Sequence, residues 1–69
     1  MIKTSLIIPA WNAENTIEDC LLSALKAKSS PNEIIVIDDV STDDTVKIVN
    51  KLKKKYSKIK LLKLDKNIG

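Results

Sequence analysis

The sequence predicts an α/β fold with the element order β-α-β-α-β and three parallel strands in the order 3-2-1. Three short blocks rich in Ile, Leu and Val, at residues 5–8, 34–37 and 59–64, predict the strands. Between them, apolar residues recur at spacings of three and four, which predicts two amphipathic helices. Connections of this length can join parallel strands through right-handed crossovers, so we expect the helices to pack on the sheet.

The ends of the predicted strands follow from local chemistry. The first two blocks are apolar without alternation, which is typical of strands buried on both faces. The first strand should end at Pro9, because proline has no N–H to donate to a neighbouring strand. The third strand is expected at residues 59–64, with Leu62 and Leu64 on one face and Leu61 on the other.

Polar side chains before each helical pattern predict where the helices begin. Asn12 or Asn15 can cap the first helix. Ser41 or Thr42 can cap the second, and Ser41 together with Asp44 resembles a capping box. The segment Ser29-Ser30-Pro31-Asn32 between the first helix and the second strand predicts a turn.

The length and composition favour one small cytoplasmic domain over residues 1–69. A chain of 69 residues buries only about 60% of its unfolded surface, so it can form a single small core. Its one cysteine, Cys20, cannot pair within the chain, which fits a reducing compartment, and we interpret it as a small buried helical residue. No apolar run approaches the ~20 residues of a membrane span, and the N-terminus lacks the pattern of a secretory signal.

The charge is strongly uneven along the chain. Residues 1–45 carry three Lys and eight acidic residues, whereas residues 46–69 carry nine Lys and one acidic residue. The lysines can form a basic surface for an anionic partner or a solvated helix face, and we favour the solvated face. The chain has no Arg and only two aromatic residues, Trp11 and Tyr56, which argues against a nucleic-acid partner. Peripheral contact with the inner face of the membrane stays open, although no motif supports it.

The candidate chemistry lies after the first two strands. Ligands of open parallel sheets bind beyond the carboxyl ends of the strands, where residues 9–12 and 38–41 should meet. Trp11 offers a flat face on which a base can stack, for roughly 1–3 kcal/mol. Asp39 can accept a hydrogen bond from a base or a ribose hydroxyl. The structural alternatives are a loop anchor for Trp11 and a carboxylate bonded to nearby backbone N–H groups for Asp38.

The glycine content narrows the type of nucleotide site. Gly69 is the only glycine, whereas a dinucleotide fingerprint or a P-loop needs several glycines near a helix start. A pyrophosphate cradled by a glycine-rich loop is therefore excluded within this chain. Nucleotide recognition must rest on side chains and a metal ion.

Three segments in order, within this strand–helix frame, resemble the start of family-2 glycosyltransferases. The patterns typical of that family are P-x-Y-N after the first strand, D-D-G-S-x-D after the second and N-x-G after the third. The matching segments are Pro9-Ala10-Trp11-Asn12, Asp38-Asp39-Val40-Ser41-Thr42-Asp43 and Asn67-Ile68-Gly69. The resemblance covers essentially the whole chain.

The resemblance implies half of a GT-A nucleotide-binding domain and a nucleotide-diphosphate sugar, of the uridine type, as ligand. Trp11 would pack against the base, Asp39 would hydrogen-bond it, Asp38 would support the loop, and Ser41 would cap the second helix. The implied nucleotide-binding residues are Pro9, Ala10, Trp11, Asp38 and Asp39.

The chain also departs from the family pattern. Trp11 replaces the usual Tyr, and Val40 replaces the usual Gly, which would be strained if that turn needs a positive φ. The resemblance places the metal-binding D-x-D motif and the catalytic base beyond the equivalent of Gly69. We therefore expect an N-terminal fragment without catalytic residues, metal ligands or a cofactor of its own. The full-length enzyme would use a divalent cation, Mg²⁺ or Mn²⁺, and a carboxylate base.

Two other functions are compatible with parts of the sequence. One is a non-enzymatic α/β association module, which would form a homo-oligomer through the exposed edge of the first strand. The other is a receiver-like domain that binds phosphate or Mg²⁺ through Asp38 and Asp39. The second is weaker, because such domains place an acidic pair after the first strand, and here that strand runs into Pro9.

Overall fold

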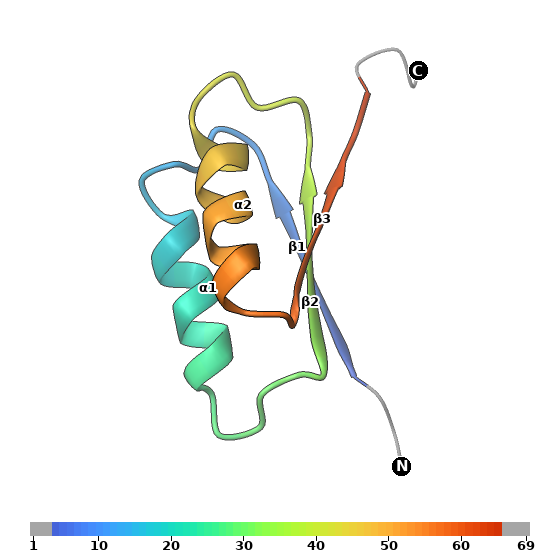
Figure 1. Cartoon of the computed structure of the whole chain (residues 1–69). Helices are drawn as coiled ribbons and strands as arrows, with labels where there is room; N and C mark the ends of the chain where they lie inside the picture. Colours follow the sequence, from blue (N-terminus) through green and yellow to red (C-terminus); the bar gives the residue numbers. More distant parts are fainter. Residues whose placement is uncertain (1–3, 66–69) are drawn as a thin grey trace.

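A computed structural model describes residues 4–65 and contains the five predicted elements. The strands form one parallel sheet in the order β1-β2-β3, which is the predicted order seen from the other edge. Both helices lie on the same face of this sheet (Figure 1). The fold-class prediction is confirmed. The elements are β1 (Ser5–Ala10), α1 (Ile17–Lys26), β2 (Glu33–Asp38), α2 (Thr45–Lys55) and β3 (Ile59–Lys63).

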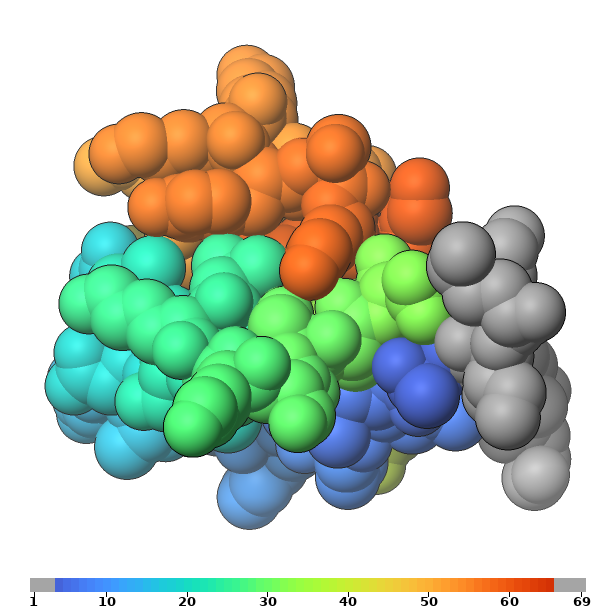
Figure 2. Space-filling view, turned by 90° about the horizontal axis from the view of Figure 1, so that it is seen from below, coloured from blue at the N-terminus to red at the C-terminus, as the bar shows by residue number. Residues whose placement is uncertain are grey.

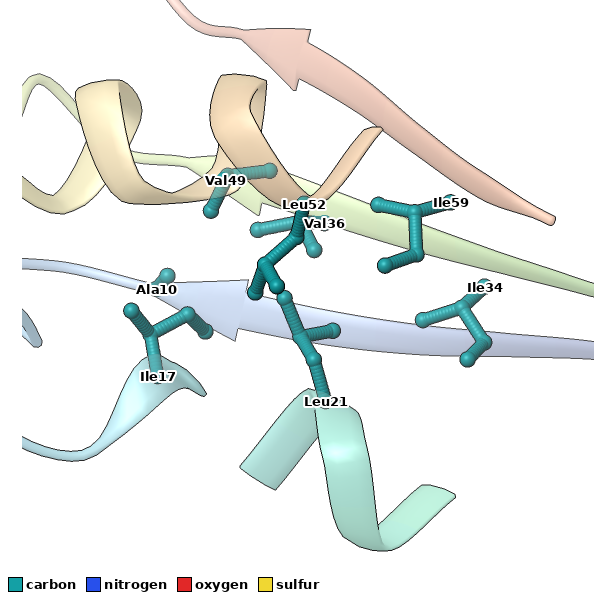
Figure 3. Packing of buried hydrophobic residues seen from close by; sticks show 8 residues of the cluster. All are labelled: Ala10, Ile17, Leu21, Ile34, Val36, Val49, Leu52 and Ile59. Carbon is teal, nitrogen blue, oxygen red and sulfur yellow. The ribbon is translucent and has the colours of Figure 1, made fainter. Parts of the chain in front are cut away.

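The hydrophobic core lies between the helices and one face of the sheet. Alternate residues of the central strand β2, Ile34 and Val36, are completely buried there. Leu21 of α1 and Val49 of α2 reach the same layer and are also completely buried (Figure 3). The whole buried cluster consists of Ala10, Ile17, Leu21, Ile34, Val36, Val49, Leu52 and Ile59.

No helix of the described residues covers the opposite face of the sheet. Ile7 is 57% exposed and Leu62 is 53% exposed, and Ile35 and Ile37 between them are half-buried. The prediction that the first strands are buried on both faces is therefore wrong for residues 4–65. An apolar run indicates which residues avoid water, but it does not indicate whether a second layer of structure covers the other face of the sheet.

Some details of the strands and of α1 also differ from the sequence prediction. β1 continues through Pro9 to Ala10, because β1 is an edge strand and such a strand tolerates a residue without an N–H. β3 ends at Lys63 instead of residue 64. Cys20 is exposed, not buried. Only a narrow face of α1 packs on the sheet, and its buried residues are Ile17 and Leu21.

At the end of the molecule where β2 and β3 begin, the segments that lead into these two strands lie side by side (Figure 2). The predicted turn joins α1 to β2, and the backbone N–H of Thr4 donates to Asn32 Oδ1 at 2.9 Å. Lys58 Nζ donates to Ser30 Oγ at 3.0 Å, which links the turn to the segment after α2. Within residues 4–65, neither helix is long and apolar enough to cross a bilayer.

Candidate functional site

Two loops lie together at the carboxyl edge of the sheet (Figure 1). The β1–α1 loop comprises residues 11–16, and the β2–α2 loop comprises residues 39–44. Ala10 and Asp38 are register partners at the ends of β1 and β2. The backbone N–H of Asp39 then donates to the carbonyl of Ala10 at 2.9 Å. Trp11 and Asp39 therefore follow neighbouring strand ends, as the sequence predicted.

The side chains of Trp11 and Asp39 are both accessible. Trp11 is 65% exposed, which does not fit the alternative of a partly buried loop anchor. The carboxylate of Asp39 is exposed and makes no hydrogen bond or ion pair with any residue of the described range 4–65. An aromatic face and a carboxylate acceptor are thus both available to a ligand at this edge.

Asp38 has a different role from its neighbour. It is only 2% exposed, and its Oδ2 accepts a hydrogen bond from the backbone N–H of Ser41 at 3.1 Å. Its Oδ1 is buried and has no hydrogen-bond partner among the described residues. Successive strand residues point to opposite faces. The Asp38 carboxylate is therefore buried and holds the loop, whereas the Asp39 carboxylate is exposed. This contact is the backbone bond considered for Asp38 from the sequence.

The other two predicted site residues can contribute mainly through shape and backbone. Pro9 is exposed at the end of β1, on the edge of the sheet. Ala10 is only 5% exposed, and its carbonyl already accepts the bond from Asp39. The ring of Pro9 is thus exposed at this edge, whereas Ala10 belongs to the core below it.

Hydrogen bonds from Asn12 and Ala13 join the two loops. The backbone N–H of Asn12 donates to Ser41 Oγ at 2.9 Å, and Asn12 Oδ1 accepts from the backbone N–H of Thr42 at 2.8 Å. Next to them, the N–H of Ala13 donates to Thr45 Oγ1 at 2.8 Å. These contacts fix the β1–α1 loop against the residues that lead into α2.

Acidic side chains add a second set of bonds between the loops. The N–H of Glu14 donates to Asp43 Oδ2 at 3.1 Å, and the N–H of Asp44 donates to Glu14 Oε1 at 3.2 Å. Asp43 Oδ1 accepts bonds from both the backbone and the hydroxyl of Thr45. Desolvation raises the pKa of Asp43, but the hydrogen bonds from Thr45 and Glu14 outweigh it, so the net pKa is lowered.

The predicted helix caps are wrong. The N-cap residues are Thr16 for α1 and Asp44 for α2, and neither side chain makes a capping hydrogen bond. The polar groups of Asn12, Ser41 and Thr42 bind across the loops instead. Such side chains can bond either to their own helix or to other backbone groups, and here the neighbouring loop supplies the partner.

Sequence reasoning missed Thr45 and Glu14 as organisers of the site. Thr45 is the first residue of α2, and it is completely buried. Its hydroxyl also accepts from Ala13, which lies 32 residues earlier in the chain. No local pattern signals this pairing, because it depends on the two strand ends being adjacent in space.

The turn after Asp39 has the backbone geometry that the sequence raised as a concern. Val40 has φ of 55°, and Asn12 in the facing loop has φ of 46°. Asn visits this left-handed region readily, because its short polar side chain can bond locally. A β-branched residue such as Val does not, so Val40 stores local strain.

Replacing Val40 by Gly is expected to stabilise the chain by about 1 kcal/mol. Relief of left-handed strain is worth roughly 1–2 kcal/mol, and the added freedom of glycine in the unfolded chain offsets part of it. Thermal unfolding monitored by circular dichroism should show a midpoint about 4–8 °C higher. Val46→Gly, in helical backbone within α2, is the matched control and should lower the midpoint. A lower midpoint for Val40→Gly would contradict the strain.

The structure also forms hollows along α2. A shallow hollow along α2 is lined by Asp43, Val46, Lys47, Asn50, Lys51 and Lys54. It has no aromatic ring and no completely buried polar group, which fits the predicted solvated face. Within residues 4–65, no three or more His, Cys, Asp or Glu side chains are grouped so that they could hold a metal ion.

Comparisons with known proteins find related sequences along almost the whole chain. A family model described as Glycosyl transferase family 2 matches residues 5–69. The chain is 38% identical to a poly(ribitol-phosphate) beta-glucosyltransferase of Bacillus spizizenii, over 99% of this chain and 11% of that relative. It is 49% identical to the Escherichia coli UDP-Glc:alpha-D-GlcNAc-diphosphoundecaprenol beta-1,3-glucosyltransferase WfaP, over 77% of this chain and 21% of that relative.

A solved structure shows the same arrangement. The crystal structure of Staphylococcus aureus TarS 1-349 superposes with a TM-score of 0.74 at 38% identity. The match covers 99% of this chain and 20% of that structure. The chain thus spans about a tenth to a fifth of the length of these three proteins. With the family model matching residues 5–69, the chain belongs to glycosyl transferase family 2.

Proposed function

We propose that this chain is the nucleoside-binding N-terminal part of a glycosyltransferase, which transfers a sugar from a nucleotide-diphosphate donor to an acceptor hydroxyl. The observation that carries the proposal is the pair of accessible side chains, Trp11 and Asp39, on two hydrogen-bonded loops at the carboxyl edge of the sheet. The family membership of the chain supports the same function. It favours a part of an enzyme over the non-enzymatic association module.

The two side chains divide the recognition of a nucleoside between them. Stacking of a base on Trp11 contributes roughly 1–3 kcal/mol. The Asp39 carboxylate accepts a hydrogen bond from a ring N–H or a ribose hydroxyl. Because a carboxylate repels a diphosphate, the base or ribose faces Asp39 and the phosphates point away from it. Pro9, Ala10 and Asp38 complete the proposed site: Pro9 is exposed at the end of β1, and the buried Ala10 and Asp38 bond to the β2–α2 loop.

A uridine nucleotide is the donor type that we propose. Uracil carries a ring N–H that suits a carboxylate acceptor. The name of the related WfaP includes UDP-Glc, which supports the same choice. The side chains of residues 4–65 do not provide a set of metal ligands, so a divalent cation would be held by other parts of the full-length enzyme. A cytoplasmic location belongs to the same proposal.

Titration of the 69-residue chain with uridine, uridine diphosphate and pyrophosphate tests the proposal. Trp11 is the only tryptophan, so its fluorescence reports stacking directly. Uridine and uridine diphosphate should both quench it saturably, whereas pyrophosphate should not. By calorimetry, Trp11→Ala should weaken uridine binding about 5- to 150-fold, which corresponds to the loss of one stacked base.

Two further variants serve as the comparison and the control for this titration. Trp11→Tyr keeps an aromatic face and should lose less affinity than Trp11→Ala. Tyr56→Phe, at the far end of α2, is the aromatic control and should bind as the wild type does. Binding of pyrophosphate as tight as that of uridine diphosphate would overturn the proposal, because it would place the affinity in the lysines and not in the nucleoside site.

A further inference from the structure

We infer that Asn12 is a positioning residue, whose side chain and backbone hold the β2–α2 loop in the strained conformation that presents Asp39 to the nucleoside. The inference rests on the proposed function, because the role of Asp39 in binding belongs to that proposal. It adds a residue that touches the loop instead of the ligand, and it explains how a valine is tolerated at position 40.

The contacts of Asn12 converge on the residues that follow the strained position. Its backbone N–H donates to Ser41 Oγ at 2.9 Å, and its Oδ1 accepts from the backbone N–H of Thr42 at 2.8 Å. Both partners lie about 30 residues away in the sequence, so the bonds fix one loop against the other. Because Thr42 donates to Oδ1, the side-chain amide oxygen of Asn12 binds the β2–α2 loop.

Val40 is restrained on both of its sides. Before it, the N–H of Asp39 is bound to the carbonyl of Ala10 at 2.9 Å. After it, Ser41 is held by Asn12 from the facing loop and by Asp38 Oδ2 from below. A β-branched residue leaves the left-handed region when its surroundings allow it. Release of the Asn12 bonds therefore lets Val40 relax and turns the adjacent Asp39 away from its present direction.

The backbone of Asn12 explains why an asparagine suits this position. Its φ of 46° is also in the left-handed region, which Asn tolerates far better than most residues. In that conformation its N–H and its Oδ1 reach two consecutive residues of the same loop. Loss of the side chain should therefore remove a restraint without creating new strain at position 12, provided that the replacement also accepts a positive φ.

Asn12→Gly meets this condition, because glycine tolerates the positive φ and lacks the Oδ1 acceptor. Uridine binding, followed by Trp11 fluorescence, should weaken about tenfold, in the range of coupling between contacting residues. Adding Val40→Gly should restore affinity to within about twofold of Val40→Gly alone, because the turn then needs no restraint. Asn15→Gly is the matched control in the same loop, has no hydrogen bond in the described structure, and should bind as the wild type does.

The outcomes separate positioning from direct contact. Wild-type affinity in Asn12→Gly would overturn the inference, as would a loss that Val40→Gly fails to rescue, since the latter would mean that Asn12 touches the nucleoside. Ser41→Ala removes the other bond, the one from the Asn12 backbone N–H, and should also weaken binding, so it carries the test if Asn12→Gly does not fold. Absence of uridine binding in the wild type would instead overturn the proposed function, and the inference with it.

Discussion

Replacing Leu21 by Ala is expected to lower the free energy of unfolding by about 2–5 kcal/mol, the usual cost of emptying a buried leucine site. Leu21 is completely buried and lies between α1 and the sheet, within the one core that the described residues form (Figure 3). A chain of this size is stabilised by only roughly 3–10 kcal/mol in total. The variant should therefore unfold at a much lower urea concentration than the wild type.

The control for Leu21→Ala is the same substitution on the uncovered face. Leu62 is 53% exposed on β3, so Leu62→Ala should change the free energy of unfolding by no more than about 0.5 kcal/mol. Urea titrations followed by circular dichroism measure both variants. Equal losses in the two would contradict the assignment of the core to the helix-covered face.

Replacing Asp39 by Ala is expected to weaken uridine binding about 10- to 150-fold, because a hydrogen bond to a charged acceptor is worth roughly 1.5–3 kcal/mol. Asp39→Asn keeps a neutral acceptor, so its loss should be smaller. Since the Asp39 side chain makes no hydrogen bond or ion pair within residues 4–65, neither variant should change the urea midpoint appreciably.

The control for Asp39→Ala is the removal of another exposed acidic side chain, and calorimetry measures both variants. Asp19 is exposed in the first turn of α1 and is not part of the β2–α2 loop, so Asp19→Ala should bind uridine as the wild type does. An equal loss in both variants would mean that net charge, and not the position of Asp39, governs the affinity.

The sheet and the meeting of the two loops could be predicted because they depend on short-range patterns. Strands and helices follow from apolar spacing, and connection length then favours parallel strands. Once the strands are parallel and adjacent, the segments after Ile8 and after Ile37 must lie at one edge. The structure confirms this arrangement, and it places Trp11 and Asp39 at the predicted edge.

The side-chain partners in the loops could not be predicted, because they depend on contacts between distant residues. Asn12 and Ser41 both match the local pattern of a helix cap, yet each finds a partner about 30 residues away. The separation of Asp38 from Asp39 depends on which face of β2 the helices cover. The exposure of Cys20 depends likewise on the narrow contact of α1 with the sheet. Sequence periodicity alone carries none of this information.

A titration of the isotopically labelled chain with uridine, followed through the backbone amide resonances, tests most directly whether the nucleoside site lies at the carboxyl edge of the sheet. Uridine carries no phosphate, so its binding does not draw on the lysines of α2. A site at this edge should give saturable shifts concentrated in residues 10–13 and 38–42, with the Trp11 indole resonance among the most affected. Shifts concentrated along α2, or no saturable shifts at all, would contradict a nucleoside site at the carboxyl edge of the sheet.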